Sequence, residues 1–178
     1  MILSIDPGSE ESAYTLTNDD LKPVKFGKVK NDELLAQLIY FPRQHFALEM
    51  VASYGMAVGK EVFDTVFWIG RFWEKADFPN KQLIYRKDEK MNLCHSMKAN
   101  DANIIQALVD RFAYGIPNKG KGTKKNPGPF FGFAGDVWQA YAVGVTYADL
   151  YLERKLGVRD GKELDHQFQP WENDNQFL

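Results

Sequence analysis

Short apolar runs and helical apolar stripes follow one another along the chain, and their order predicts an α/β fold. The first run spans residues 2–5 and ends at Asp6, where a Pro-Gly pair forces a turn. Segments rich in β-forming residues over 12–17 and 23–29 extend this run to an antiparallel meander of three strands. Because apolar residues fall on both sides of the first run, we expect its strand to be buried on both faces.

The rest of the chain alternates helical and extended patterns. In order, these predict a helix over 33–40 capped by Asn31 and Asp32, a strand over 45–51, a helix over 59–78, a strand over 82–86, a helix over 101–113 and a last helix from 135 to about 156. The buried stripe of the second helix is predicted to be Val62, Val66, Ile69, Phe72 and Trp73. A strand that follows a crossover helix usually pairs in parallel within the same sheet. We therefore expect a five-stranded mixed sheet, three antiparallel strands and then parallel ones, flanked by helices.

The bulk composition predicts one globular domain. The chain has 178 residues, of which 44% are hydrophobic, enough to bury a sizeable core. We assign residues 1–157 to this domain and residues 158–178, rich in acids and amides, to an irregular acidic tail. The sequence has no apolar run of about eighteen residues and no signal-peptide pattern, so we expect no membrane contact and a cytoplasmic location.

Charge and cysteine content narrow the chemistry. The formal net charge of −2 argues against a uniformly basic nucleic-acid binder. Cys94 is the only cysteine, which excludes an internal disulfide and a cysteine-based zinc site, and the three histidines are scattered. Any bound metal would therefore have mostly oxygen ligands.

Three carboxylates are placed so that they can converge. Asp6 ends the first strand, Glu49 lies near the end of the fourth, and Asp136 begins the last helix. Clustered carboxylates repel one another unless divalent cations neutralise them, and such sites suit Mg²⁺. Two such ions about 4 Å apart can activate a water and stabilise the leaving oxygen in phosphodiester cleavage. Each acid also has a structural alternative: Asp6 as a turn residue, Glu49 as a partly exposed strand residue and Asp136 as a helix cap.

The ordered set of these segments resembles a known family. It consists of Ser4-Ile5-Asp6-Pro7-Gly8, Phe46-Ala47-Leu48-Glu49 and Gly135-Asp136-Val137-Trp138-Gln139-Ala140-Tyr141-Ala142-Val143. These look like the corresponding segments of the RuvC-type Holliday junction resolvases of the RNase H-like superfamily, nearest to the phage-encoded branch. The resemblance covers roughly residues 1–157 in element order.

The resemblance carries expectations about function. It implies an RNase H-like fold, a homodimer, and cleavage of four-way DNA junctions that depends on Mg²⁺, with Mn²⁺ as a substitute. It also implies a place in DNA recombination and repair, in the host cytoplasm if the chain is phage-encoded. Catalytic and metal-binding roles would fall to Asp6, Glu49 and Asp136.

The last helix departs from the family pattern at one position. RuvC-type proteins usually carry two metal-binding side chains there, three residues apart, and the second position in this chain is Gln139. Glutamine offers a carbonyl oxygen but no charge, so either Gln139 coordinates weakly or a fourth ligand comes from elsewhere. Asp101 is the candidate replacement, and its alternative role is helix capping.

Two features are candidates for DNA contact. Residues 115–132 break all periodicity and carry a group of four lysines: Lys119, Lys121, Lys124 and Lys125. We expect this mobile loop either to order on DNA phosphates, with Phe130, Phe131 and Phe133 beside it, or to be a solvated linker. Tyr54, in the turn after the fourth strand, is either an aromatic wedge at a junction centre or a packing residue.

Three functions are compatible with these observations. The first is a metal-dependent, structure-selective DNA endonuclease that acts on four-way junctions and related branched DNA. The second is a non-catalytic RNase H-like module that binds branched DNA, which the neutral Gln139 favours. The third is an RNase H-like nuclease for flaps or RNA/DNA hybrids, because the fold alone does not choose the substrate.

Overall fold

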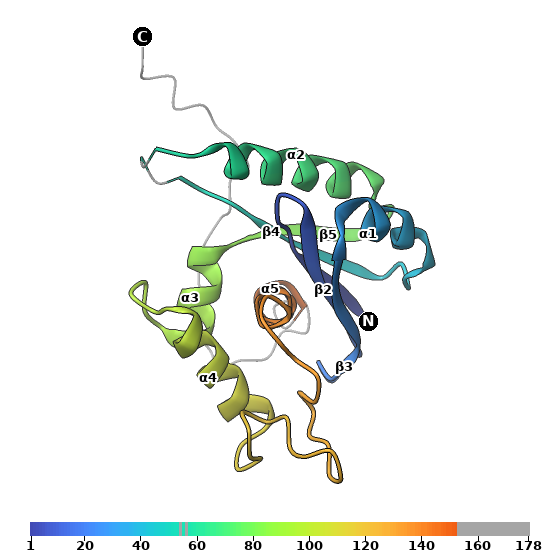
Figure 1. Ribbon diagram of the computed structural model, residues 1–178. Helices are drawn as coiled ribbons and strands as arrows, with labels where there is room; N and C mark the ends of the chain where they lie inside the picture. The colour runs from blue at the N-terminus through green and yellow to red at the C-terminus, as the bar shows by residue number, and fades with distance from the viewer. Residues whose placement is uncertain (54, 56, 153–178) are drawn as a thin grey trace.

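A computed structural model describes residues 1–53, 55 and 57–152 of the chain (Figure 1). Its strands are β1 (Ile2–Asp6), β2 (Glu11–Thr17), β3 (Pro23–Lys30), β4 (His45–Met50) and β5 (Asn80–Tyr85). Its α-helices are α1 (Asn31–Gln37), α2 (Lys60–Lys75), α3 (Arg86–Cys94), α4 (Asp101–Phe112) and α5 (Val137–Tyr147). A 3₁₀-helix (Leu38–Tyr40) extends α1, and a π-helix (Ala148–Leu152) extends α5.

The five strands form one mixed sheet in the order β3-β2-β1-β4-β5. The pairs β1–β2 and β2–β3 are antiparallel, whereas β4 runs parallel to both β1 and β5. The predicted sheet of three antiparallel strands followed by parallel ones is therefore confirmed. Strand β1 lies at its centre, and its first four residues are buried, as expected for a strand covered on both faces.

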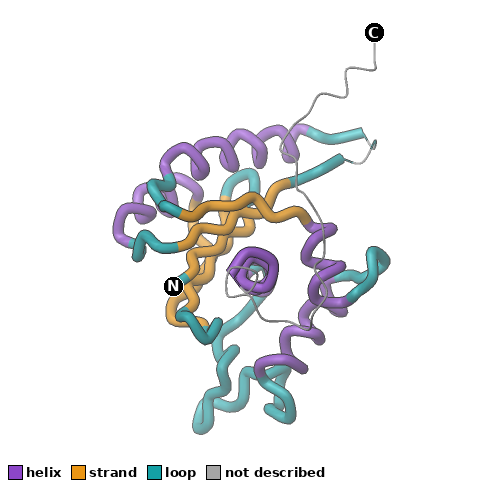
Figure 2. The backbone as a smooth tube through the Cα atoms, turned by 180° about the vertical axis from the view of Figure 1, so that it is seen from behind, coloured by secondary structure: helices purple, strands orange, loops and turns teal. Residues whose placement is uncertain are grey.

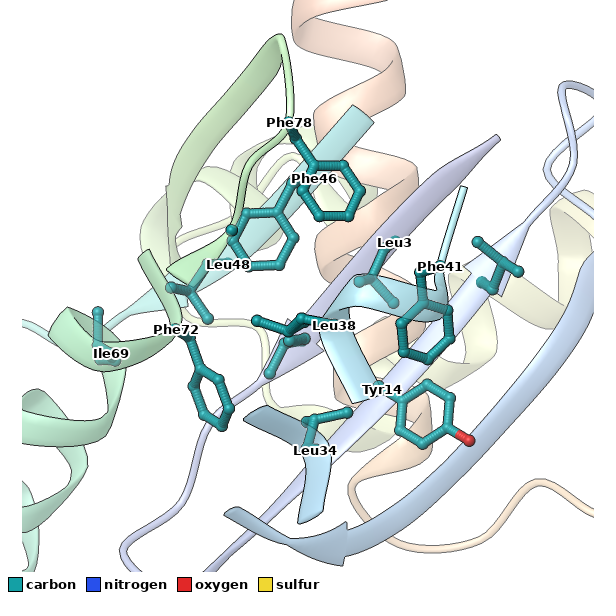
Figure 3. Packing of buried hydrophobic residues seen from close by; sticks show 13 residues of the cluster. Leu3, Tyr14, Leu34, Leu38, Phe41, Phe46, Leu48, Ile69, Phe72 and Phe78 are labelled. Atoms are coloured by element: carbon teal, nitrogen blue, oxygen red, sulfur yellow. The ribbon is translucent and has the colours of Figure 1, made fainter. Parts of the chain in front are cut away.

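Side chains of β1 and β4 alternate between two packed layers. Leu3, Ile5, Phe46 and Leu48 point into a core that α1 and α2 close, which Figure 3 shows from nearby. Ile2 and Ala47 belong to a second core on the opposite face, together with residues of α5. Figures 1 and 2 show α5 end-on between the sheet and the pair α3 and α4. The layers are thus α1/α2, sheet, α5, and α3/α4.

Helix α5 lies unusually close to the central strand. A Cβ atom added at Gly144 would stand 2.7 Å from Ser4 Oγ and 3.2 Å from Ser4 Cβ, so only glycine fits at this contact. Ala140 and Ala142 of the same helix are also fully buried. The π-helix is held from the other side, because the carboxylate of Asp149 accepts hydrogen bonds from Arg111 of α4 at 2.6 and 2.8 Å and from Asn92 of α3 at 2.8 Å.

Two details of the predicted helices are wrong. The stripe proposed for α2 included Val66, but Val66 is exposed, and the residues that face the sheet are Thr65, Ile69 and Phe72. The N-cap of α1 is Lys30, and Asn31 is buried inside the first turn. Helix α3 was not predicted at all, since its residues are mostly charged and show little amphipathic period. The tail assigned to 158–178 and the end of the last helix beyond 152 lie outside the described residues.

Candidate active site

Asp6 and Glu49 are brought together by the parallel pairing of β1 and β4. Ile5 lies opposite Leu48 in that pairing, so the next residue of each strand, Asp6 and Glu49, is its neighbour across the pair. Because side chains alternate along a strand, Asp6 shares the face of Ser4, and Glu49 shares the face of Ala47. Both carboxylates therefore lie on the side of the sheet that α5 covers.

The turn after Asp6 is fixed by a buried polar network centred on Asn31. The Asn31 amide accepts a hydrogen bond from Ser12 Oγ at 2.6 Å and donates one to the Gly8 carbonyl at 2.9 Å. Ser12 Oγ also accepts from the Gly8 amide at 3.3 Å. A Cβ at Gly8 would stand 2.4 Å from the Glu11 carbonyl oxygen. The role predicted for Asn31 as a helix cap is thus replaced by one that holds the Asp6 turn.

The two carboxyl groups are strongly coupled. Burial, with the charge of Glu49 and a hydrogen bond to its carboxyl group, raises the pKa of Asp6 to about 9. Burial also raises the pKa of Glu49, although its hydrogen bond to Asp6 and the charge of Arg86 act in the opposite direction. The pair therefore retains a proton at neutral pH unless a cation takes its place.

Asp136 stands beside this pair but faces a different partner. It occupies the N-cap position of α5, but its carboxylate makes no capping hydrogen bond among the described residues. Instead it accepts a hydrogen bond from Lys28 Nζ of β3 at 2.7 Å, with half of its side chain exposed. Its charge nevertheless contributes to the raised pKa of Asp6, which places it within electrostatic range of the site.

Gln139 follows Asp136 by one turn of α5. Its Oε1 atom is buried and has no hydrogen-bond partner among the residues that the structure describes. Buried polar oxygens are rarely left without a partner, and each one calls for an explanation. No hydrogen bond from the described residues therefore occupies this carbonyl oxygen.

Glu89 is the charged residue of this region that sequence reasoning missed. It lies in α3, is fully buried, and accepts a hydrogen bond from Arg86 Nη1 through Oε2 at 2.6 Å. Asp88, whose carboxylate accepts a hydrogen bond from the Tyr85 amide at 3.2 Å, marks the start of α3, but nothing in the sequence distinguishes Glu89 from its charged neighbours.

Arg86 Nη2 also pairs with Asp101, the candidate fourth ligand, whose side chain is 68% exposed at the start of α4. The helix-capping role belongs to Asn100, not Asp101.

The described side chains around Asp6 and Glu49 do not form a complete set of metal ligands in this structure. Within residues 1–53, 55 and 57–152, no three His, Cys, Asp or Glu side chains are grouped so that they could hold a metal ion. The Asp136 carboxylate is instead engaged in its ion pair with Lys28. Beside Glu49, a cavity of about 330 Å³ opens between the end of β4 and the start of α2, with Val51, Val58 and Val62 on its apolar wall and Arg86 on its polar one. Tyr54 lies outside the described residues.

The segment that carries the lysine group is more ordered than the loop predicted from the sequence. Lys119, Lys124 and Lys125 are exposed, and the segment between them folds back through a bridge from Gly122 to Pro127. Two of the aromatic residues predicted beside the lysines, Phe130 and Phe133, are fully buried and pack on Trp138 and Tyr141 of α5. They anchor the segment to the core, so of the three only Phe131 is exposed.

The sheet order, with α5 across its centre and acids at the ends of β1 and β4, defines an RNase H-like fold of the RuvC type. Thermus thermophilus RuvC in complex with a Holliday junction substrate matches with a TM-score of 0.58 and 16% identity, over 88% of this chain and 95% of that one. A structure of Thermus thermophilus RuvC by itself matches with a TM-score of 0.54 and 16% identity, over 86% and 96%. No protein-family model and no curated protein matches the sequence. At this identity the likeness concerns the fold.

Proposed function

We propose that the protein is a metal-dependent, structure-selective DNA endonuclease that cleaves phosphodiesters at four-way (Holliday) junctions and related branched DNA. The observation that carries the proposal is the coupled pair Asp6 and Glu49 at the centre of a RuvC-type sheet. Two adjacent carboxyls that hold a proton only because they are buried together are poised to exchange it for a divalent cation. DNA recombination and repair, and the host cytoplasm if the chain is phage-encoded, are the predicted setting.

The donor atoms at the ends of β1 and β4 and at the start of α5 are all oxygens, which is the ligand chemistry that suits Mg²⁺, with Mn²⁺ as its substitute. Asp6, Glu49 and Asp136 supply carboxylate oxygens, and Gln139 supplies a buried carbonyl oxygen that has no partner among the described residues. Hard divalent cations prefer such oxygen ligands. When bound, the metal supplies an activated water and stabilises the leaving oxygen of the phosphodiester.

The side chains of this chain have separate roles. Asp6 and Glu49, fixed by the strand pairing and by the Asn31 network, would hold the divalent cation at one end of the sheet. Lys28 keeps the Asp136 carboxylate in place and puts a cation beside an otherwise acidic site, where it favours the approach of a phosphate.

Recognition of DNA is assigned to the exposed lysines ahead of α5. Lys119, Lys124 and Lys125 with the half-buried Lys121 lie on the segment that leads directly to Asp136. One of the structural neighbours, Thermus thermophilus RuvC, is in complex with a Holliday junction substrate, which supports branched DNA as the ligand.

A homodimer is the proposed assembly. The outer face of α2 carries Phe63 and Phe67, 64% and 63% exposed and one turn apart, with the exposed Val66 beside them. Large aromatic side chains gathered on one exposed helix face mark a protein–protein contact. A second copy of the chain is the expected partner, because a two-fold pair would present two sites to the two strands of a junction that must both be cut.

One rival function has an observation in its favour. A non-catalytic module that binds branched DNA would not need a fourth acid, and Gln139 brings no charge. A nuclease for flaps or RNA/DNA hybrids shares every feature of the site and differs only in the substrate.

Labelled four-way junction, duplex, flap and RNA/DNA hybrid, incubated with Mg²⁺, with Mn²⁺ and with a chelator, separate these functions. We expect cleavage of the junction alone, only with a metal, and its loss in Asp6→Asn, which should still bind the junction. Asp110→Asn, which removes an exposed acid hydrogen-bonded within α4, is the control and should cleave normally. Binding without cleavage in every condition would establish the rival module.

A further inference from the structure

Glu89 is a buried acid that the three proposed carboxylate ligands leave without a role. Its side chain is 0% exposed, and its two oxygens have different surroundings. Oε2 accepts a hydrogen bond from Arg86 at 2.6 Å, whereas Oε1 is buried without a hydrogen-bond partner among the described residues. A fully buried carboxylate oxygen is costly unless something compensates it.

The fold carries Glu89 to the same end of the sheet as Glu49. Glu49 lies opposite Ile84 in the β4–β5 pairing, and α3 begins at Arg86, two residues after Ile84. Glu89 lies in the first turns of that helix. The electrostatics agree with this placement, because Glu49 raises the pKa of Glu89, after burial itself, and Glu89 contributes to the raised pKa of Asp6.

A purely structural role for Glu89 accounts for only one of its two carboxylate oxygens. The ion pair with Arg86 explains how Glu89 is tolerated, and it fixes the rotamer of the carboxylate through Oε2. It does not explain Oε1, which is buried and has no hydrogen-bond partner among the described residues. A residue selected only to hold Arg86 could have done so as Asp101 does, from an exposed position.

We propose that Glu89 is an acidic ligand of the divalent-cation site, binding through Oε1 and supplying the negative charge that Gln139 lacks. This rests on the proposed function, since it assigns a ligand to the same site. Arg86 is then a positioning residue, because it holds Oε2 and leaves Oε1 directed to the cation. Asp101, which pairs with the other side of the same guanidinium, belongs to this outer layer and not to the ligands.

The test is Mn²⁺ binding without DNA, measured by the electron paramagnetic resonance signal of the free ion. Glu89→Gln keeps the shape of the side chain and removes its charge. We expect it to weaken at least one Mn²⁺ site by about tenfold or more, the loss typical of a disturbed metal shell. Asp110→Asn, which removes one acidic charge from α4, is the matched control and should bind as the wild type does.

Further variants distinguish the alternatives. Asp101→Asn should leave Mn²⁺ affinity nearly unchanged, and a loss there with none in Glu89→Gln would overturn the proposal in favour of Asp101. Wild-type affinity and stoichiometry in Glu89→Gln would also overturn it. If Glu89→Gln does not fold, Glu89→Asp replaces it, because that variant keeps the charge for Arg86 and withdraws the oxygen by one methylene. A wild type that binds no Mn²⁺ would instead refute the proposed function itself.

Discussion

At the scale of single residues, Asp6 and Glu49 make each other harder to ionise, and this has consequences for stability. Each sits at the end of a buried parallel strand, so burial is the main cause of the raised pKa in both. Glu89 is affected in the same direction. Because these three acids have raised pKa values, the stability of the metal-free protein should depend on pH well above the usual titration range of carboxyl groups.

We predict that the metal-free protein melts at a lower temperature as the pH rises. The pKa of Asp6 is about 9 in the folded protein and 3.8 as its reference value, so the folded state binds the proton more tightly. Its stabilising contribution is complete below about pH 4 and is lost as the pH rises towards 9. Thermal melts in chelator between those values should show the decline, and Mg²⁺ should raise the melting temperature most at high pH.

The variant Asp6→Asn provides the internal control for that experiment. It cannot ionise, so its melting temperature in chelator should depend less on pH than that of the wild type. Parallel curves for the two proteins would show that Asp6 is not the group responsible.

At the scale of elements, the contact between α5 and β1 sets the distance between Asp136 and Asp6. Gly144 touches Ser4 so closely that a methyl group must push the helix outward. Gly70 of α2 is the opposite case, since a Cβ there would meet nothing within 4 Å. The two glycines lie in helices and allow the same substitution to be compared in two surroundings.

We predict that Gly144→Ala destabilises the protein by about 1–3 kcal/mol, the usual result of overfilling a packed contact. It should also reduce cleavage, because α5 carries Asp136 and Gln139. Gly70→Ala should instead stabilise by about 1 kcal/mol, the helix-propensity gain at an open position. Chemical denaturation of both variants checks the two signs, and equal effects would argue against the close α5–β1 contact as the cause.

The elements also show what sequence could and could not predict. The strands and the long helices could be predicted from the periodicity of apolar residues. Asp6, Glu49 and Asp136 could be named as candidates because each lies at or near the end or start of such an element. Helix α3 could not, since Arg86 to Lys90 contains only charged residues and resembles a solvated surface. Glu89 is fully buried there and paired with Arg86, a result of tertiary packing that has no local signature in the sequence. The Lys28–Asp136 pair joins residues 108 positions apart and is equally invisible to local patterns.

At the scale of the whole molecule, the proposed dimer face and the lysine group lie on different elements. The exposed Phe63, Val66 and Phe67 belong to α2, on the outer layer of the sheet, while the lysines precede α5 on the other layer (Figure 1). Assembly and DNA binding can therefore be perturbed one at a time.

We predict that Phe63→Glu combined with Phe67→Glu converts a dimer to a monomer without unfolding it. Both side chains are largely exposed, so the change adds charge to a surface and leaves the core intact. Light scattering after size-exclusion chromatography reports the mass, and circular dichroism reports the fold. Lys60→Glu on the same helix, whose side chain is 89% exposed, is the control. A monomeric wild type would remove the dimer proposal.

We predict that replacing Lys119, Lys121, Lys124 and Lys125 with alanine weakens junction binding and leaves the cut positions unchanged. For every phosphate that is no longer neutralised, the slope of log affinity against log salt should become shallower by about 0.9. The measurement is junction affinity at several salt concentrations. An unchanged salt slope would show that this lysine group does not contact phosphates. The candidates for DNA contact would then be other basic residues, among them Arg71, Lys75, Lys87 and Lys98.

The anchoring of the lysine segment by Phe130 and Phe133 makes it a natural place to divide the protein. The segment is exposed between Thr123 and Pro127, yet both of its ends are tied to the core, at Gly120 on one side and at the two phenylalanines on the other. Helix α5, which follows it, is surrounded by the sheet, α3 and α4. Trypsin should therefore nick the native protein after Lys124 without releasing the C-terminal piece. The two fragments on either side of this cut, expressed separately, should associate into a nuclease, and neither fragment should be active without the other.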